Sequence, residues 1–345
     1  MRPAVETRTN IAQIEMAHGA GGKATRRLIE GIILPAFANP ILEALSDSAL
    51  VTVDGKRLAL TADGFVVKPL RFPGGSIGSL AVHGTVNDLA VAGARPLALL
   101  ATFILEAGLE GEVLEREVAA MAQAARTCGV HIVGGDTKVV EHGMADGMYV
   151  STFGLGCVDE RLTLGPQQAR AGDAVLLSGP IGEHGITILL ARGELELEAD
   201  IASDTRSVFP FVNALCEAAA PAIRWMRDPT RGGVATALNE LARDARVGVI
   251  LEEAAVPLSD CVRGACEILG LDPLHIANEG QLLAVVAPES ARATQQAMRA
   301  VQGGQDSAII GELAAEPKGR VVSRTSYGGT RVVDMLVGDP LPRIC

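Results

Sequence analysis

The chain ends in a cysteine, and the residues before it could deliver its thiol to a reaction site. Residues 340–345 read PLPRIC, so two prolines hold the backbone in an extended path just ahead of the thiol. At roughly 3.3 Å per residue, such a segment spans about 20 Å, which is enough to enter a neighbouring cleft. We therefore expect a tail that stays outside the core and presents Cys345 as a nucleophile or carrier. The alternative is an ordinary terminus that happens to end in cysteine.

Acidic residues meet at one end of a predicted hairpin. The Asp-Gly pair at 54–55 lies between two apolar runs and is typical of a two-residue turn, which places Val53 opposite Lys56. In this register Asp47 comes beside Asp63. Two carboxylates so close would repel each other, whereas Mg²⁺ would keep both ionised and bridge to phosphate oxygens. Two solvated turn aspartates are the alternative.

Two further carboxylates have the surroundings of metal ligands. Asp88 falls late in a helix expected after Ser76, among apolar residues, so it is either hydrogen-bonded inside the fold or bound to a metal. Asp136 and Lys138 belong to the run GGDTK at 134–138, which we expect just past a strand end. There they would suit a metal–nucleotide site, with the lysine meeting phosphate as a point charge. A tight turn with surface charges is the alternative.

Two glycine-rich loops could bind phosphate. Residues 18–23 read HGAGGK and run into a helical pattern, and residues 228–233 read DPTRGG ahead of a second helix. Backbone N–H groups at such positions can face an anion, with Thr230 as a possible N-cap and Arg231 beside it. Simple turns are the alternative at the first loop, and an N-cap alone would explain Thr230.

The hydrophobic periodicity predicts two α/β units, and the motifs described above fall in both of them. A polar, turn-rich stretch at 158–172 separates the units, so we expect domains at 1–157 and 158–338, followed by a mobile tail at 339–345. Glu279 comes just before the strand expected at 282–286 and is a metal ligand, a general base or a plain turn carboxylate. The other expected elements are strands at 97–105, 130–133, 148–153 and 174–178, and helices at 112–126 and 234–244.

Composition excludes several classes of protein. The 345 residues have a net charge of −11 and only 3% aromatic residues, so we expect no nucleic-acid partner. We see neither a signal peptide nor a membrane-spanning run, and the six cysteines form no CxxC pair. These features predict a cytoplasmic protein without a zinc site or a disulfide framework.

Together the motifs resemble the HypE family of hydrogenase maturation factors, in the aminoimidazole ribonucleotide synthetase superfamily. The resemblance covers essentially the whole chain. Several of the motifs are shared across the superfamily, whereas the tail that ends in cysteine points to HypE. The matching segments are HGAGG at 18–22, FPGG at 72–75, GTVNDLA at 84–90, GGDTK at 134–138, DPTRGG at 228–233, NEG at 278–280 and PRIC at 342–345.

This resemblance implies a two-domain α/β (α+β) fold with a flexible C-terminal tail, and an ATP-dependent carbamoyl dehydratase. In the family, the tail cysteine receives a carbamoyl group from the carbamoyltransferase HypF. ATP then drives the removal of water, which leaves a sulfur-bound cyanide. A HypC–HypD complex accepts the cyanide for the iron of nickel-iron hydrogenase. The resemblance further implies a homodimer whose N-terminal domains pair their sheets.

The reaction suggests roles for the residues. Lys138 would stabilise charge on the transferred phosphoryl group, Glu279 would act as base, and Cys345 would be acceptor and carrier. The departing phosphate would meet Arg231 and the amides of Gly232 and Gly233. Candidate Mg²⁺ ligands are Asp47, Asp63, Asp88 and Asp136, and the expected nucleotide contacts are His18, Gly19, Gly21, Gly22, Asp136 and Thr137.

Three other functions remain open at this point. Selenophosphate synthetase, in the same superfamily, has its reactive residue in the N-terminal glycine-rich segment, whereas the first cysteine here is Cys128. Thiamine monophosphate kinase has no use for a tail ending in cysteine. A non-catalytic docking scaffold would hydrolyse no ATP and would tolerate Cys345→Ser.

Overall fold

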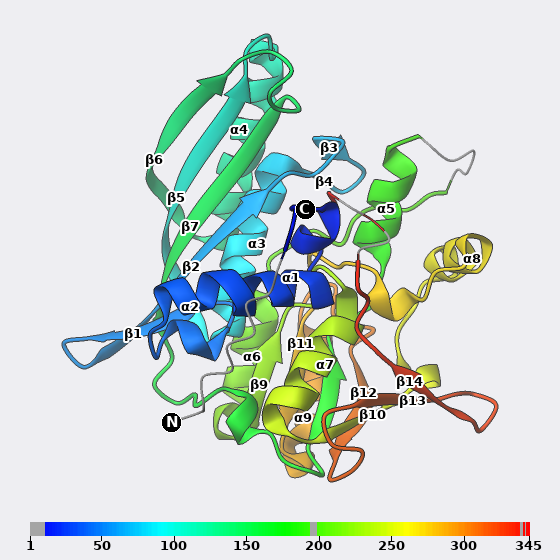
Figure 1. Cartoon of the computed structure of the whole chain (residues 1–345). Helices are drawn as coiled ribbons and strands as arrows, with labels where there is room; N and C mark the ends of the chain where they lie inside the picture. Colours follow the sequence, from blue (N-terminus) through cyan, green and yellow to red (C-terminus); the bar gives the residue numbers. More distant parts are fainter. Residues whose placement is uncertain (1–10, 194–198, 339–340, 342) are drawn as a thin grey trace.

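The computed structural model describes residues 11–193, 199–338, 341 and 343–345 (Figure 1). Two α/β units follow each other along the chain, one built on a five-stranded sheet and the other on a seven-stranded sheet. The α/β fold predicted from the sequence is confirmed. Among the described helices, none has the length and apolar character needed to cross a membrane.

The first sheet has the strand order β1-β2-β7-β5-β6. Its hairpin is confirmed, because Val53 lies opposite Lys56 and both turn residues at 54–55 have positive φ. Its strands are β1 (Ala49–Val53), β2 (Lys56–Phe65), β5 (Ala94–Glu106), β6 (His131–Val140) and β7 (Met148–Val158). The short strands β3 (Arg71–Phe72) and β4 (Gly75–Ser76) form a separate pair, and the helices α1 (Lys23–Leu28) and α2 (Leu34–Phe37) precede the sheet.

Two long helices, α3 (Ile77–Val91) and α4 (Gly111–Cys128), cover one face of this sheet (Figure 1). α4 ends at Gly129 in the left-handed conformation, as the sequence predicts. α3 is buried on nearly all sides because it also packs against the second unit. There the Asn87 side chain donates to the carbonyl of Arg206 (3.0 Å) and accepts from the amide of Val208 (2.8 Å). This helix therefore fixes the two units to each other.

The opposite face of the first sheet carries exposed apolar side chains. Leu100 and Phe153 are cross-strand partners on β5 and β7 and are 43% and 44% exposed. Leu60 and Ile104 are similarly exposed, and the alternation along the strands places them on the same face. A sheet face of this kind is usually covered by another surface.

The second sheet is covered on both faces. Val175 and Leu177 pack on one side with α7, while Leu176 packs on the other with α6 and α9, as the alternation of a buried strand requires. The strands, in spatial order, are β14 (Thr330–Val333), β13 (Val321–Arg324), β10 (Gly248–Glu252), β12 (Ala308–Ala314), β8 (Ala174–Leu177), β11 (Leu283–Val286) and β9 (Ile223–Arg227). The helices are α5 (Glu183–Ala191), α6 (Phe209–Ala219), α7 (Gly233–Ala245), α8 (Asp260–Leu269) and α9 (Ala291–Ala300).

The C-terminal tail differs from the expectation. Leu341, Ile344 and Cys345 are buried and belong to a core cluster with residues of both units, and the amide of Val66 donates to a terminal carboxylate oxygen of Cys345 (3.0 Å). The expectation of a tail that stays outside the core is therefore wrong, because apolar side chains and backbone hydrogen bonds seat its last residues. Residues 339, 340 and 342, including both tail prolines, lie outside the described residues.

The GGDTK run also differs from the expectation. Residues 134–138 lie within β6, an edge strand, and not past a strand end. A Cβ on Gly135 would lie 1.7 Å from the carbonyl oxygen of Ala101 on β5. The close approach of two strands therefore requires glycine at this position. From the sequence alone, the same glycine pair is equally consistent with a loop.

Candidate active site at the junction of the two units

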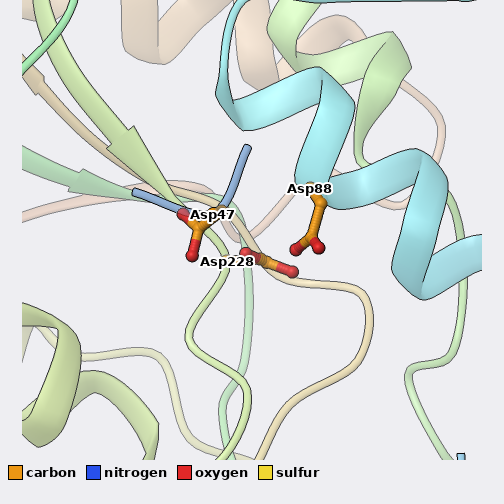
Figure 2. A group of neighbouring side chains, drawn as sticks. All are labelled: Asp47, Asp88 and Asp228. Atoms are coloured by element: carbon orange, nitrogen blue, oxygen red, sulfur yellow. The ribbon is translucent and has the colours of Figure 1, made fainter. Parts of the chain in front are cut away.

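Three carboxylates meet where the two units join. Oxygen atoms of Asp47, Asp88 and Asp228 lie within 4.8 Å of one another, and Figure 2 shows the three side chains gathered beside α3. Asp47 precedes β1, Asp88 lies on α3, and Asp228 directly follows β9. The first unit therefore supplies two carboxylates and the second unit supplies one.

Burial and mutual repulsion raise the pKa values of this cluster. Burial, together with the charge of Asp47, raises the pKa of Asp228 to about 7. Burial also raises the pKa of Asp88 well above its ordinary value, and the charges of Asp228, Asp47 and Asp63 raise it further. For Asp63 the same desolvation dominates. The ionised form of this cluster is therefore unfavourable unless a positive charge accompanies it.

Neighbouring groups balance only part of this charge. Burial alone would lower the pKa of Arg227, but Asp47, whose Oδ1 lies 3.0 Å from its Nε, raises it above the usual range. Arg227 also pairs with Glu240 at 3.2 Å. Thr61 donates to Asp88 Oδ2 at 2.7 Å. A set of carboxylate oxygens with charge left unbalanced fits a hard divalent cation such as Mg²⁺.

Arg231 connects the N-terminal glycine loop to the site. Its guanidinium donates to the carbonyl of Gly19 at 3.2 Å, and a Cβ on Gly21 would lie 2.8 Å from the Arg231 Cβ. The structure therefore brings together the two loops that the sequence predicts to bind phosphate. His18 lies in the same loop, half-buried, where its Nδ1 accepts from the amide of Glu15 (3.0 Å).

The loop at 228–233 ends differently from the expectation. The N-cap of α7 is Gly232, in the left-handed conformation and without a side-chain cap, so the assignment of Thr230 as N-cap is wrong. A Cβ on Gly233, which also has positive φ, would lie 2.5 Å from the Leu274 carbonyl. The amide of Gly233 donates to the carbonyl of Thr230 (2.9 Å), so this amide is not free for the expected phosphate contact. No side chain caps the amides that follow it, and these are left for another acceptor.

Glu279 is a buried acid in the loop before β11. Its Oε1 is buried and has no hydrogen-bond partner within the part of the chain that the structure describes. Burial raises its pKa well above the ordinary value, and the charges of Asp228 and Asp204 raise it further. Once ionised, such a carboxylate is a stronger base than a solvated one.

The terminal residue lies at the same place. The charge of Cys345 is the leading cause of a raised pKa for Arg231, and the charges of Asp63 and Glu279 act in the same direction. Arg231 is therefore within electrostatic range of the end of the tail and of acidic groups of the site. Its loop also carries Asp228, so the docked tail ends near the loop that supplies one carboxylate of the cluster.

Asp136, Thr137 and Lys138 are not part of this site in the chain's own fold. In the sheet, Asp63 aligns with Thr152, Ala101 and Gly135 in one row that faces the helices. Asp136 and Lys138 follow Gly135 by one and three positions on β6, so their side chains point to the opposite face of the sheet. The strand β6 also lies three strand spacings from β2, about 14 Å at about 4.8 Å per spacing. There they are exposed and pair with each other at 2.7 Å. The placement of Asp136 beside the other candidate metal ligands is therefore wrong within one chain.

Asp228 takes the place expected for Asp136 in the carboxylate cluster, and the sequence analysis missed it as a candidate metal ligand. Its loop, residues 228–233, was predicted only to bind phosphate. The available signal was its position directly after an apolar strand, at the carboxyl end, where the side chains of α/β sites gather.

Comparison with known proteins agrees with this architecture. Residues 45–158 match the family model "AIR synthase related protein, N-terminal domain", and residues 170–324 match the C-terminal domain model of the same family. The two-unit fold is thus that of an AIR synthase-related protein.

Individual relatives show which members of the AIR synthase-related family this chain resembles. Carbamoyl dehydratase HypE from Bradyrhizobium diazoefficiens is 50% identical over 332 residues, which cover 96% of each chain. A crystal structure of a HypE–HypF complex has a TM-score of 0.85 at 42% identity and covers 90% of this chain and 99% of its own. A HypE structure in complex with ATP has a TM-score of 0.80 at 44% identity and covers 96% and 100%. The chain belongs to the carbamoyl dehydratase HypE family.

Proposed function

We propose that this protein uses ATP to dehydrate a carbamoyl group on the Cys345 thiol to a thiocyanate, the source of the cyanide ligands of the nickel-iron hydrogenase iron. The observation that carries this proposal is the docked tail, whose terminal cysteine is buried among residues of both units and within electrostatic range of Arg231. A family of carbamoyl dehydratases and a HypE structure bound to ATP supply the reaction class and the co-substrate.

The reaction balances as the loss of one water. The amide oxygen of the S-carboxamide is a poor leaving group, so it departs with the γ-phosphoryl group of ATP as phosphate. Both N–H protons are removed, a carbon–nitrogen triple bond forms, and ADP remains. The protein must therefore accept protons beside the sulfur and balance charge where phosphate leaves.

The residues divide these tasks as follows. Glu279, buried and with an unpartnered oxygen, accepts a proton from the carbamoyl nitrogen. Arg231 binds the departing phosphate, together with the amides of α7 that follow Gly233 and that no side chain caps. The loop of Gly19, Gly21 and Gly22, with His18, lies against Arg231 and contributes amides to the nucleotide. Mg²⁺ held by Asp47, Asp88 and Asp228, with Asp63 close by, would neutralise phosphate charge.

Asp136, Thr137 and Lys138 require a second copy of the chain to contribute. Asp136 and Lys138 lie on the same face of the first sheet as the exposed Leu100 and Phe153, and Thr137 lies between them on the edge strand β6. We propose a homodimer joined through this face, in which Lys138 of one copy stabilises the transferred phosphoryl group in the site of the other. The apolar face and the position of β6 at the sheet edge support this arrangement.

The partners follow from the same chemistry. A carbamoyltransferase, HypF, loads the thiol, which agrees with the solved HypE–HypF complex of a relative. A HypC–HypD complex is the proposed acceptor of the cyanide. We also propose a cytoplasmic location, since all six cysteines are free thiols, as is typical of a reducing compartment.

Intact mass of the full-length protein tests the function. After carbamoylation by HypF, addition of ATP and Mg²⁺ should remove the mass of one water and leave a label on the peptide containing Cys345. The Cys345→Ala variant should take up no carbamoyl group while it still binds ATP. A carbamoylated chain that retains its water after ATP hydrolysis would contradict the dehydratase assignment.

A further inference from the structure

The seat of the tail includes a buried histidine for which the reaction scheme above has no role. His184 lies in the first turn of α5, fully buried, and its Nε2 lies 2.8 Å from the carbonyl oxygen of Ile344. This carbonyl belongs to the peptide group that joins Ile344 to Cys345. His184 therefore contacts the last peptide bond before the reacting thiol.

The hydrogen-bond partners fix the tautomer of His184. A carbonyl oxygen can only accept, so Nε2 carries the proton, and Nδ1 must accept from the hydroxyl of Ser203 at 2.8 Å. The imidazole and the ring of Phe72 pack nearly perpendicular to each other, with centroids 5.6 Å apart. The histidine is thereby held in one orientation with its single donor directed at the tail.

The other side of the tail is held by the first unit. The amide of Val66 donates to a terminal carboxylate oxygen of Cys345 (3.0 Å) and the amide of Lys68 to the carbonyl of Arg343 (3.4 Å), in the alternating pattern of an added strand. Arg343 also pairs with Asp146 at 2.6 Å. The tail thus lies between a strand-like edge of the first unit and His184 of the second.

The residues that orient His184 also hold the loop of Glu279. Ser203 bonds to His184, and the neighbouring Asp204 accepts from the amides of Glu279 (3.0 Å) and Gly280 (3.2 Å). Arg206 donates from its Nε to the carbonyl of Gly280 at 2.9 Å. The segment 203–206 therefore bonds to the seat of the tail at one end and to the base loop at the other.

We propose that His184 is a positioning residue that aligns the carbamoylated Cys345 with Glu279, and that the segment 203–206 fixes the distance between the two. This inference rests on the proposed dehydratase function. It assigns His184 no contact with the reacting atoms, so its effect is on the placement of the thiol and not on the chemistry of proton transfer.

Two variants separate the contacts of His184. His184→Asn keeps a polar group near Ser203 but is too short to reach the Ile344 carbonyl, whereas His184→Gln places an N–H donor near the position of Nε2. His83 on α3 is a matched control. It is also a histidine largely removed from solvent, but its ring contacts Cys128 and not the tail.

The first measurement is the alkylation rate of Cys345 in the full-length protein, resolved by peptide mass and made without ATP or partners. Loss of one hydrogen bond that holds the tail should raise this rate about tenfold in His184→Asn. His184→Gln and His83→Asn should stay within about twofold of the wild type. An unchanged rate in His184→Asn would overturn the docking role, whatever the activity.

The second measurement is the single-turnover rate of dehydration at saturating ATP, starting from the carbamoylated chain. We expect a drop of about tenfold in His184→Asn with ATP affinity unchanged, and recovery in His184→Gln. Faster alkylation with normal dehydration would overturn the positioning role. If the wild-type chain itself fails to dehydrate the carbamoyl group, the proposed function is wrong. The alkylation rates then still show whether His184 holds the tail.

Ser203→Ala provides a second route if His184→Asn does not fold. It removes the donor to Nδ1 but leaves the imidazole in place, so alkylation of Cys345 should rise by a smaller factor. A rise in His184→Asn or Ser203→Ala supports the docking, and wild-type rates in a folded Ser203→Ala protein would count against it.

Discussion

The carboxylate cluster at the junction and the Asp136–Lys138 pair on β6 use similar residue types in opposite surroundings. Asp47, Asp88 and Asp228 come from three separate segments and are held at the junction, where burial raises their pKa values. Asp136 is exposed, and its hydrogen bond to Lys138 lowers its pKa. The first group is poised to bind a cation, and the second is already neutralised.

The difference shows that surroundings, and not residue type, decide what a carboxylate can do. A buried cluster with more negative than positive charge gains free energy when a cation enters. An exposed ion pair is solvated and gains little from a further partner. Asp136 and Lys138 can join the chemistry only if another surface covers them, which is the role proposed for the second copy.

We expect the largest difference between the two regions when one carboxylate of each is replaced by its amide, Asp228 in the buried cluster and Asp136 on β6. Asp228→Asn removes a charge from the cluster, so dehydration and Mg²⁺-dependent ATP binding should each fall by at least about a hundredfold. In the isolated chain, Asp136→Asn should leave the response of the melting temperature to Mg²⁺ unchanged. The check is thermal unfolding with a Mg²⁺ titration. If both variants lost the Mg²⁺ response equally, the assignment of Mg²⁺ binding to the buried cluster and not to Asp136 would be wrong.

Mixing two impaired variants tests whether Lys138 acts in the site of a second copy. Lys138→Ala and Glu279→Gln should each lower dehydration by about tenfold to a hundredfold while carbamoylation continues. If Lys138 serves the site of the partner copy, an equal mixture of the two variants should regain about a quarter of the wild-type activity, since half the dimers carry one intact site. Single-turnover rates before and after subunit exchange measure this. Unchanged turnover in Lys138→Ala would exclude it from the site, and a mixture no better than its components would exclude a role across the dimer.

The pH dependence of stability gives the smallest effect. The raised pKa of Asp228, about 7, means that between pH 8 and pH 6 the folded chain takes up a proton that the unfolded chain, with an ordinary pKa of 3.8, does not. Without metal, the free energy of unfolding should therefore rise by about 1 kcal/mol as the pH falls from 8 to 6. Asp228→Asn or added Mg²⁺ should flatten this slope, as followed by urea unfolding. A slope that persists in Asp228→Asn would assign the titration to another group. The exposed Asp136 has a lowered pKa, so its titration affects stability only in the acid range, as the pH falls through and below its ordinary value of 3.8.

The local elements were largely predictable from the sequence. The Asp-Gly turn fixed the register of the first hairpin and hence brought Asp47 toward Asp63, because side-chain direction along a strand has a period of two residues. Glycine at the end of α4 and the apolar runs of the second sheet were equally clear. Such signals depend on a few neighbouring residues, and the structure leaves them unchanged.

The composition of the site was only partly predictable. Glu279, Arg231 and the glycine loop were recognised by their motifs, and the structure places them near one another. Asp228 was missed as a candidate metal ligand, and Asp136 was wrongly placed in the carboxylate cluster. The two residues have similar sequence surroundings, because each follows an apolar run and has a glycine pair nearby. Only the pairing order of the strands decides which of them faces α3.

Two α/β units, a candidate reactive cysteine in the C-terminal segment and the residue types that the proposed reaction needs can all be recognised from the order of the amino acids. The docking of the tail between the units, the completion of the carboxylate cluster by Asp228 and the contact of His184 with the peptide group before Cys345 become visible only in the folded chain. Turns and periodicity follow from local preferences. The charge balance and burial of a site depend instead on segments far apart in the chain, which only the packing of the two units brings together.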